Sequence, residues 1–299
     1  MDNLPDFYIQ KAKIELNETE TRKKQSLEQF NEWLSKHPFV KKHEIDPSII
    51  VRLFRSRKYN MDKVYENINK CIIFQKNHQE LFNFNITKLL EIYDKGVILP
   101  MKIRNADGQR IIIVRNKIFD DLKSSNYDIM RMVFTVGDTI SYEQETQICG
   151  VVVVMDLREI SVRYIANMDV NFFANCIRYI ESAGARLKQI NIIGLPSIAN
   201  TFLEILKTML SQKLISRMHF FKNVQDLTKV MDVKNLPVEY GGSEDADDCL
   251  KCYREKYKES ASKYAKFIES LEIDEKRMRN YEAKEMFKGV GSFRKLEID

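Results

Sequence analysis

The chain has 299 residues, of which 44% are apolar and 30% charged, and its formal net charge is +5. This length allows one large globular domain or two ordinary ones, and the mild positive charge is weaker than the dense basic stripe of a dedicated nucleic-acid binder. The first residues lack the blocks of a signal peptide, and no stretch reaches the roughly 18 apolar residues of a membrane span. We therefore expect a soluble cytoplasmic protein. Its five scattered cysteines predict reduced thiols.

The first part of the chain predicts a small helical unit, residues 1–86. Residues 10–35 are polar with one apolar stripe, which is typical of surface helices. A second helix is expected to begin at Pro47 behind a capping Asp46, because proline suits the first helical position. A third helix is expected from Val64 to Phe74.

Strand and helix patterns alternate from residue 87 to 243. Gly96 to Pro100 and Arg110 to Arg115 predict a hairpin, with its turn at Asn105 to Gly108. A helix from Tyr127 to about Gln144 follows. The run from Val151 to Asp156 begins with five apolar residues without alternation, which indicates a strand covered on both faces.

The alternation continues with a helix from Asn171 to Ala183, a strand around Ile190 to Ile193 and a strand at Met218 to Phe221. Between the last two strands, Pro196 precedes an apolar helix over Ser197 to Leu210. Such alternation predicts an α/β domain with a mixed or parallel sheet over residues 87–243. Residues 244–299 are polar and predict one charged helical extension.

Four cations edge the apolar helix after Pro196: Arg186, Lys188, Lys213 and Arg217. An apolar helix flanked by cations is either an ordinary surface helix on a sheet or a hydrophobic lid that touches an anionic lipid surface. Solvated charges on a polar face are the simpler interpretation of the same residues.

No pattern in the chain supports catalysis, a metal site or a cofactor. The buried strand ending at Asp156 is not followed by a glycine-rich phosphate loop, and Cys249 and Cys252 lack the second ligand pair of a zinc site. His219, beside Phe220, is expected to be a core histidine. We therefore predict a protein that is not an enzyme and needs no cofactor.

Four motifs together carry a family resemblance. Leu53 to Asp62 (LFRSRKYNMD) resembles the signature of the helical N-terminal part of CRAL-TRIO proteins, which are Sec14-like lipid-binding proteins. Leu236 to Gly242 (LPVEYGG) resembles the end of their lipid-binding domain. Val153 to Leu157 and Ile192 to Pro196 stand where that family has a buried strand and a turn. Gly291 to Leu296 resembles the tail of insect members similar to α-tocopherol transfer protein and retinaldehyde-binding protein.

The resemblance implies a helical N-terminal bundle, an α/β lipid-binding domain with a mixed sheet and a mobile gate helix, and a helical C-terminal tail. It implies a monomeric carrier that encloses one small hydrophobic lipid and visits membranes transiently. The implied cavity wall is Met130, Val133, Gly137, Val151, Met155, Phe173, Ile177, Ile180, Leu187 and Ile190, and the implied gate is Ile198, Phe202, Ile205 and Met209. Val133 and Gly137 stand where α-tocopherol transfer protein has serines, so the choice between a tocopherol-like and a retinoid-like ligand stays open.

The resemblance also implies a phosphoinositide site at Arg57, Arg186, Lys188, Lys213 and Arg217. Guanidinium and ammonium groups gathered beside an apolar lid would bind lipid phosphates and draw the gate to an anionic membrane. An alternative function is a phosphoinositide-responsive adaptor, in which the C-terminal tail recruits a protein partner.

Overall fold

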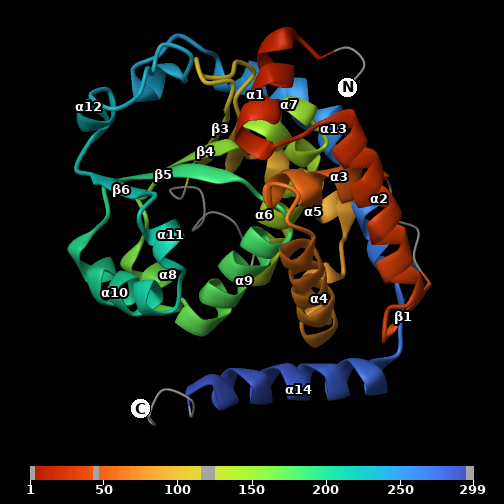
Figure 1. Ribbon diagram of the computed structural model, residues 1–299. Helices are drawn as coiled ribbons and strands as arrows, with labels where there is room; N and C mark the ends of the chain where they lie inside the picture. The colour runs from red at the N-terminus through yellow and green to blue at the C-terminus, as the bar shows by residue number, and fades with distance from the viewer. Residues whose placement is uncertain (1–3, 43–46, 116–124, 294–299) are drawn as a thin grey trace, which may run out of the picture.

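The computed structural model describes residues 4–42, 47–115 and 125–293 (Figure 1). Asp46, the expected helix cap, and Arg294 to Leu296 of the C-terminal motif lie outside these ranges. The described residues form a helical N-terminal unit, a central mixed sheet with helices on both sides, and a C-terminal pair of helices. The predicted α/β fold is confirmed.

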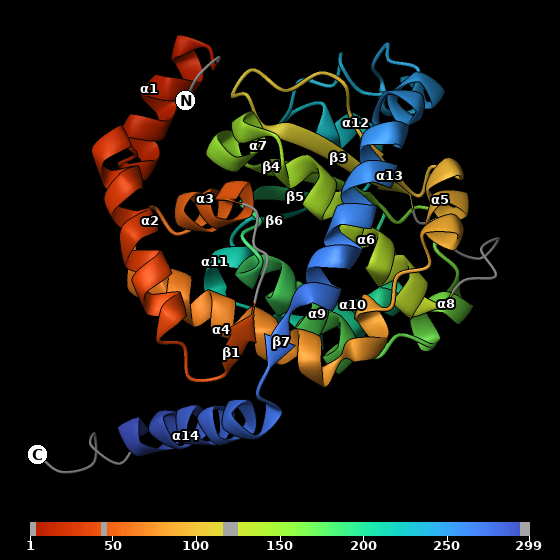
Figure 2. The ribbon, with the colours of Figure 1, turned by 90° about the vertical axis from the view of Figure 1, so that its right-hand side faces the viewer.

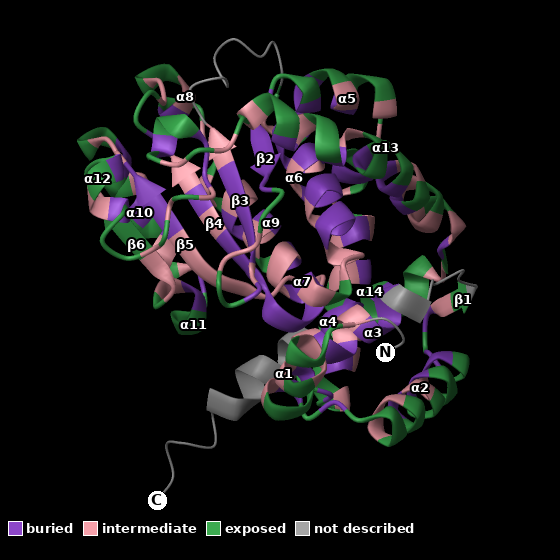
Figure 3. Ribbon diagram, turned by 90° about the horizontal axis from the view of Figure 1, so that it is seen from above, coloured by how far each residue is buried: buried purple, intermediate pink, exposed green. Residues whose placement is uncertain are grey.

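Helices build the N-terminal unit. Their bounds are α1 (Asp6–Leu16), α2 (Glu20–Ser35), α3 (Pro47–Ser56), α4 (Met61–Asn77) and the 3-10 helix η1 (Gln79–Phe82). The next helix, α5 (Ile86–Asp94), packs with α6 (Asn126–Ser141) and α13 (Ala246–Ser270) instead. The side chains of Thr19 and Asn60 cap α2 and α4 by accepting hydrogen bonds from backbone N–H groups. Phe30, Phe54 and Val64 are buried together on the inner faces of these helices, while α2 keeps its outer face exposed (Figure 3).

A buried ion pair fixes α3 to its neighbours. Arg55 donates from Nε and Nη2 to the carboxylate of Glu18, at 2.8 and 2.7 Å, and from Nη1 to Oε1 of Gln147 at 2.7 Å. Both charged side chains are almost completely buried. Because a bidentate guanidinium–carboxylate pair has a fixed geometry, this contact sets the position of α3 against the rest of the protein.

The central sheet has five strands in the order β2-β3-β4-β5-β6. Their bounds are β2 (Ile98–Pro100), β3 (Arg110–Arg115), β4 (Val151–Asp156), β5 (Leu187–Ile193) and β6 (Met218–Phe221). β2 and β3 form the predicted hairpin, and the other neighbours are parallel. The register places Ile112 beside Val153 and Val153 beside Ile190, so the apolar residues of three strands share one face.

Helices of different length cover the two faces of the sheet (Figure 1). One face is covered by α6 (Asn126–Ser141), α9 (Val170–Ser182) and α10 (Asn200–Thr208), with the shorter α7 (Gln144–Cys149), α8 (Val162–Ala166), η3 (Ser197–Ala199) and α11 (Gln212–Ile215) at its edges. The other face packs against α12 (Val224–Leu227) and η4 (Val238–Tyr240).

The C-terminal segment is helical, as the sequence predicts, and a short strand divides it into two helices. It consists of α13 (Ala246–Ser270), the short strand β7 (Glu272–Ile273) and α14 (Glu275–Phe293). α13 is interrupted at Leu271, which is extended, and β7 then pairs with β1 (Val40–Lys42) of the N-terminal unit. α13 lies across the body of the protein, and α14 runs along its end (Figure 2).

Much of α13 is part of the core. Its Tyr253, Tyr257 and Ala261 are buried against α5 and α6. Tyr257 stacks on Tyr93 with 4.6 Å between ring centroids, and its hydroxyl hydrogen-bonds to that of Thr135 at 2.9 Å. The division into domains 1–86, 87–243 and 244–299 stays a prediction, and α13 packs within the second of these segments.

The prediction of a core histidine at position 219 is wrong. Within the described residues β6 pairs with β5 alone and is an edge strand, so His219 and Phe220 are exposed. An apolar strand pattern does not distinguish an edge strand from a central one, because both carry β-branched and aromatic residues.

Candidate functional site: an apolar cavity beneath a two-faced helix

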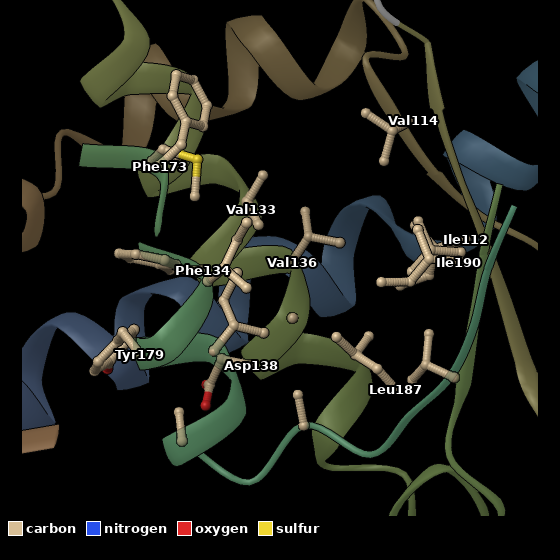
Figure 4. Close-up of a pocket in the computed structure, with 18 of the residues that line it drawn as sticks. Ile112, Val114, Val133, Phe134, Val136, Asp138, Phe173, Tyr179, Leu187 and Ile190 are labelled. Carbon is tan, nitrogen blue, oxygen red and sulfur yellow. The ribbon is translucent and has the colours of Figure 1, made fainter. Parts of the chain in front are cut away.

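A cavity of about 430 Å³ lies between the sheet and the helices. Ile112, Val153 and Ile190 form its sheet side, while Val133 of α6 and Phe173 of α9 line its helical side (Figure 4). Most of the lining side chains are aliphatic or aromatic. A volume of this size is within the range of small-molecule sites, and its apolar wall suits a hydrophobic ligand.

The structure brings the ten predicted cavity residues together on this wall. They are Met130, Val133, Gly137, Val151, Met155, Phe173, Ile177, Ile180, Leu187 and Ile190. Gly137 faces open space, because a Cβ added there would meet no atom within 4 Å. Their role in ligand binding stays a prediction.

The predicted gate residues are divided between two faces of η3 and α10. Phe202 lines the cavity, whereas Ile198 and Ile205 are 51% and 47% exposed. Met209 packs beside Leu210 in the cluster under the helix and does not line the cavity. The inner face is formed by residues that the sequence analysis did not select, namely Ala199, Leu203, Leu206 and Leu210. The helix is apolar on both sides, so its periodicity alone gave no unique inner face.

Gly194 connects β5 to this helix. Its φ is +67°, in the left-handed region that glycine adopts without strain. A Cβ at this position would lie 2.4 Å from Cγ of Arg158. Both the backbone conformation and the lack of space for a Cβ therefore require glycine in the turn before the helix.

Four of the five predicted phosphoinositide-binding cations lie within electrostatic range of one another. Burial and the charges of Arg217, Arg57 and Arg186 lower the pKa of the exposed Lys213. Arg57 donates to the backbone oxygen of Glu181 at 2.7 Å, and Arg217 donates to that of Leu187. The negative charge of Glu181 acts in the opposite direction on the pKa of Lys213.

Lys188 and Arg186 are held by an acidic side chain of α1. The carboxylate of Glu15 lies 3.2 Å from Nζ of Lys188 and 3.6 Å from Nη2 of Arg186. Burial by itself would raise the pKa of Glu15. The nearby cations outweigh burial, so this pKa lies below its usual value. Arg186 therefore links the two sets of cations: its charge acts on Lys213, and it shares Glu15 with Lys188.

The profile of the CRAL/TRIO domain matches residues 94–242. The chain belongs to the CRAL/TRIO family. Clavesin-1 of Xenopus laevis is 23% identical over 245 residues, which cover 79% of this chain and 72% of clavesin-1. The alpha-tocopherol transfer protein-like protein of Mus musculus is 24% identical over 254 residues, which cover 81% of this chain and 71% of that protein. These relatives are vertebrate proteins, so membership of an insect branch stays a prediction.

Among solved structures, the crystal structure of Sfh5 aligns with a TM-score of 0.46 and 11% identity, covering 81% of this chain and 89% of that one. Membership of the CRAL/TRIO family implies a protein that binds or transfers a lipid. In this CRAL/TRIO chain most of the cavity wall comes from the matched domain, and α3, α4 and the end of α13 complete it.

The CRAL/TRIO cavity also has polar residues that the sequence analysis did not select. Arg52 of α3 and Asp138 of α6 line its wall and form an ion pair at 2.8 Å. Asp138 stands among the apolar residues of α6, a signal that was present in the sequence. Its partner lies 86 positions earlier in the chain, a separation that no local pattern connects.

No group of three or more metal-ligating side chains occurs in the described parts of this CRAL/TRIO chain. Within the same described residues, no helix has the length and apolar character needed to cross a bilayer.

Proposed function

We propose that the chain is a non-enzymatic carrier that binds one small hydrophobic lipid, tocopherol-like or retinoid-like, and transfers it between membranes. The observation that supports this most directly is the cavity of about 430 Å³ with its apolar wall. Burial of ligand surface would supply the affinity, at about 25 cal/mol per Å² before the costs of ordering. The name of one relative, alpha-tocopherol transfer protein-like, supports a lipid of this kind.

In this proposal α10 is the gate. Its inner side chains, such as Leu203 and Leu206, cover the cavity, while its exposed Ile205 and the exposed Ile198 of the preceding η3 enter the interface of a membrane. An apolar face with cations beside it is the composition that favours helix binding at an anionic membrane surface. Contact with the bilayer would then replace the contacts that keep the gate closed.

Phosphoinositide would promote release at the neighbouring cations. Lys213 already experiences repulsion from Arg217 and Arg57, which contributes to its lowered pKa. A phosphate group between these side chains would relieve that repulsion and accept their hydrogen bonds. Because anionic lipids face the cytoplasm, we infer a cytoplasmic protein that is transiently peripheral at membranes and acts as a monomer.

Native mass spectrometry tests the carrier function. The purified protein is mixed with vesicles of a complex lipid extract, separated from them and measured intact. We expect one lipid per chain. A protein that stays empty after exposure to tocopherol, retinoids and membrane lipids would exclude the proposal.

A paired charge reversal tests the phosphoinositide step. Lys213→Glu with Arg217→Glu should weaken binding to phosphoinositide vesicles and slow lipid transfer, while leaving lipid loading intact. The control Lys251→Glu with Lys258→Glu makes the same change in net charge on exposed positions of α13. Equal effects of the two pairs would show that only net charge matters.

The adaptor function is a second candidate because α14 runs along the end of the molecule (Figure 2). Its charged side chains Lys276 and Lys284 are exposed. Lys276→Glu with Lys284→Glu changes both of them. A carrier should keep its transfer rate in this variant, whereas an adaptor should lose capture of its protein partner in a pull-down.

A further inference from the structure

One group of polar side chains meets on the cavity wall, apart from the other polar lining residues Ser141, Thr146, Gln147 and Arg186. The five that meet there come from five helices and are Arg52, Gln75, Asp138, Tyr179 and Tyr264. Figure 4 shows Asp138 and Tyr179 at the helical end, whereas Ile112, Val114 and Ile190 lie toward the sheet. A polar group of this kind beside a largely apolar lining suits an amphipathic ligand.

Two tyrosines and a glutamine at this end form hydrogen bonds with one another. The hydroxyls of Tyr179 and Tyr264 are 2.5 Å apart, and Nε2 of Gln75 donates to the Tyr179 hydroxyl at 3.0 Å. Burial raises the pKa of both tyrosines, so both remain neutral. These groups form a closed network with no charge.

Arg52 has unused donors. It donates from Nη1 to Oδ1 of Asp138 at 2.8 Å, and only 11% of its side-chain surface is exposed. Its Nε is buried without a hydrogen-bond partner in the described parts of the chain. Leaving a buried donor unpaired is costly, and a guanidinium has five N–H groups but no acceptor. A ligand that offers an oxygen acceptor here would recover part of that cost.

The charges of Arg52 and Asp138 determine whether a charged or a neutral ligand oxygen is favoured here. Asp138, with 4% of its side chain exposed, already neutralises Arg52. A ligand carboxylate would place a second anion beside Asp138 in a setting of low dielectric, where an unbalanced charge is expensive. A neutral oxygen makes the hydrogen bond without that cost.

We propose that Arg52 is the hydrogen-bond donor to the polar end of the cargo, and that the cargo is an uncharged lipid ending in an oxygen acceptor. Fatty acids and pure hydrocarbons are disfavoured. This inference rests on the proposed carrier function and narrows its substrate class.

Displacement of a fluorescent acyl-chain reporter from the purified protein tests it. The competitors are three long-chain probes of equal length: a methyl ketone, a carboxylic acid and an alkane. We expect the ketone to displace the reporter at lower concentration than the acid does. If the reporter and all three probes fail to bind, the carrier function itself is wrong.

The variant Arg52→Met with Asp138→Leu removes both charges together, which avoids leaving one charge buried alone. It should lower affinity for the ketone about tenfold, the effect of losing one hydrogen bond to a charged donor, and leave affinity for the alkane unchanged. Arg52→Lys keeps the charge opposite Asp138 and removes the planar donor group, so it should shift the ketone in the same direction.

A control variant at the opposite end separates a specific effect from a general one. Ile190→Ala removes apolar contact at the sheet side and should weaken ketone and alkane alike. The inference is overturned if the acid binds best, or if the Arg52 variants weaken ketone and alkane equally. In either case the carrier function would stand.

Discussion

The two faces of the central sheet carry the same kinds of side chain, but one face is packed in a filled core and the other borders a cavity. On β3, Ile111 and Ile113 pack with α12 and η4 in a continuous core, whereas Ile112 and Val114 border the cavity. β5 repeats this contrast, with Ile193 in the core and Ile190 on the cavity wall. Residues of one strand therefore pack either in the filled core or on the cavity wall, depending on the face of the sheet on which they lie.

The elements across each face account for the difference. The short α12 and η4 bring Leu227, Leu236 and Tyr240 directly onto the strands. On the other face, α6, α9 and α10 cover the sheet, and Gly137 withholds a side chain at the centre. A protein interior normally packs without large voids, so a preserved cavity requires helices that hold one another apart from the sheet.

Substitution of adjacent isoleucines is the most direct way to break this comparison. Ile113→Ala should lower the free energy of unfolding by about 2–5 kcal/mol, because it opens a void in a filled core. Ile112→Ala should cost about 1–2 kcal/mol, since that side chain already borders empty space. Urea unfolding of both variants measures the difference, and equal losses would show that the two faces are packed alike.

Filling the cavity should stabilise the protein and reduce lipid binding. Gly137→Leu places a side chain in open space and removes a glycine from α6, so the unfolding free energy should rise by about 1 kcal/mol while lipid loading falls. Gly137→Ala is the matched control, because it gives the same gain in helix propensity with little added volume. Full lipid loading in Gly137→Leu would show that the ligand lies elsewhere.

Changes on the outer face of the gate should have the smallest effect. Ile198→Ser with Ile205→Ser should reduce vesicle binding by less than tenfold, because these side chains are only half exposed. Ile103→Ser, at an exposed position outside the gate, should leave vesicle binding unchanged. Sedimentation with vesicles measures both, and a loss of stability in the gate variant would mean that its isoleucines support the fold.

The sequence was sufficient for the fold because hydrophobic periodicity and strand runs report secondary structure directly. The apolar run at β4 and the hairpin of β2 and β3 identified the sheet. It could not separate cavity from core, because Ile112 and Ile113 are equally apolar and only the elements opposite them differ. Nor could it predict that α13 lies within the core, since its Tyr253 and Tyr257 are spaced along a mostly charged helix.

The residues of the candidate site could be predicted only at positions that the family resemblance covers. The ten cavity positions followed from the resemblance, whereas the inner face of α10 did not follow from its periodicity. Arg52 and Asp138 illustrate the limit most clearly, because their ion pair depends on how two distant helices cross.

The pairing of β1 with β7 has a consequence for synthesis of the chain. Asp274 donates its backbone N–H to Phe39, and Met278 is buried with Phe30 and Phe54. The N-terminal helices are therefore translated first but lack part of their core until nearly the whole chain has left the ribosome. Domains generally fold in order of synthesis. This unit should be an exception that reaches its native packing late and depends longer on chaperones, because part of its core comes from the C-terminal segment.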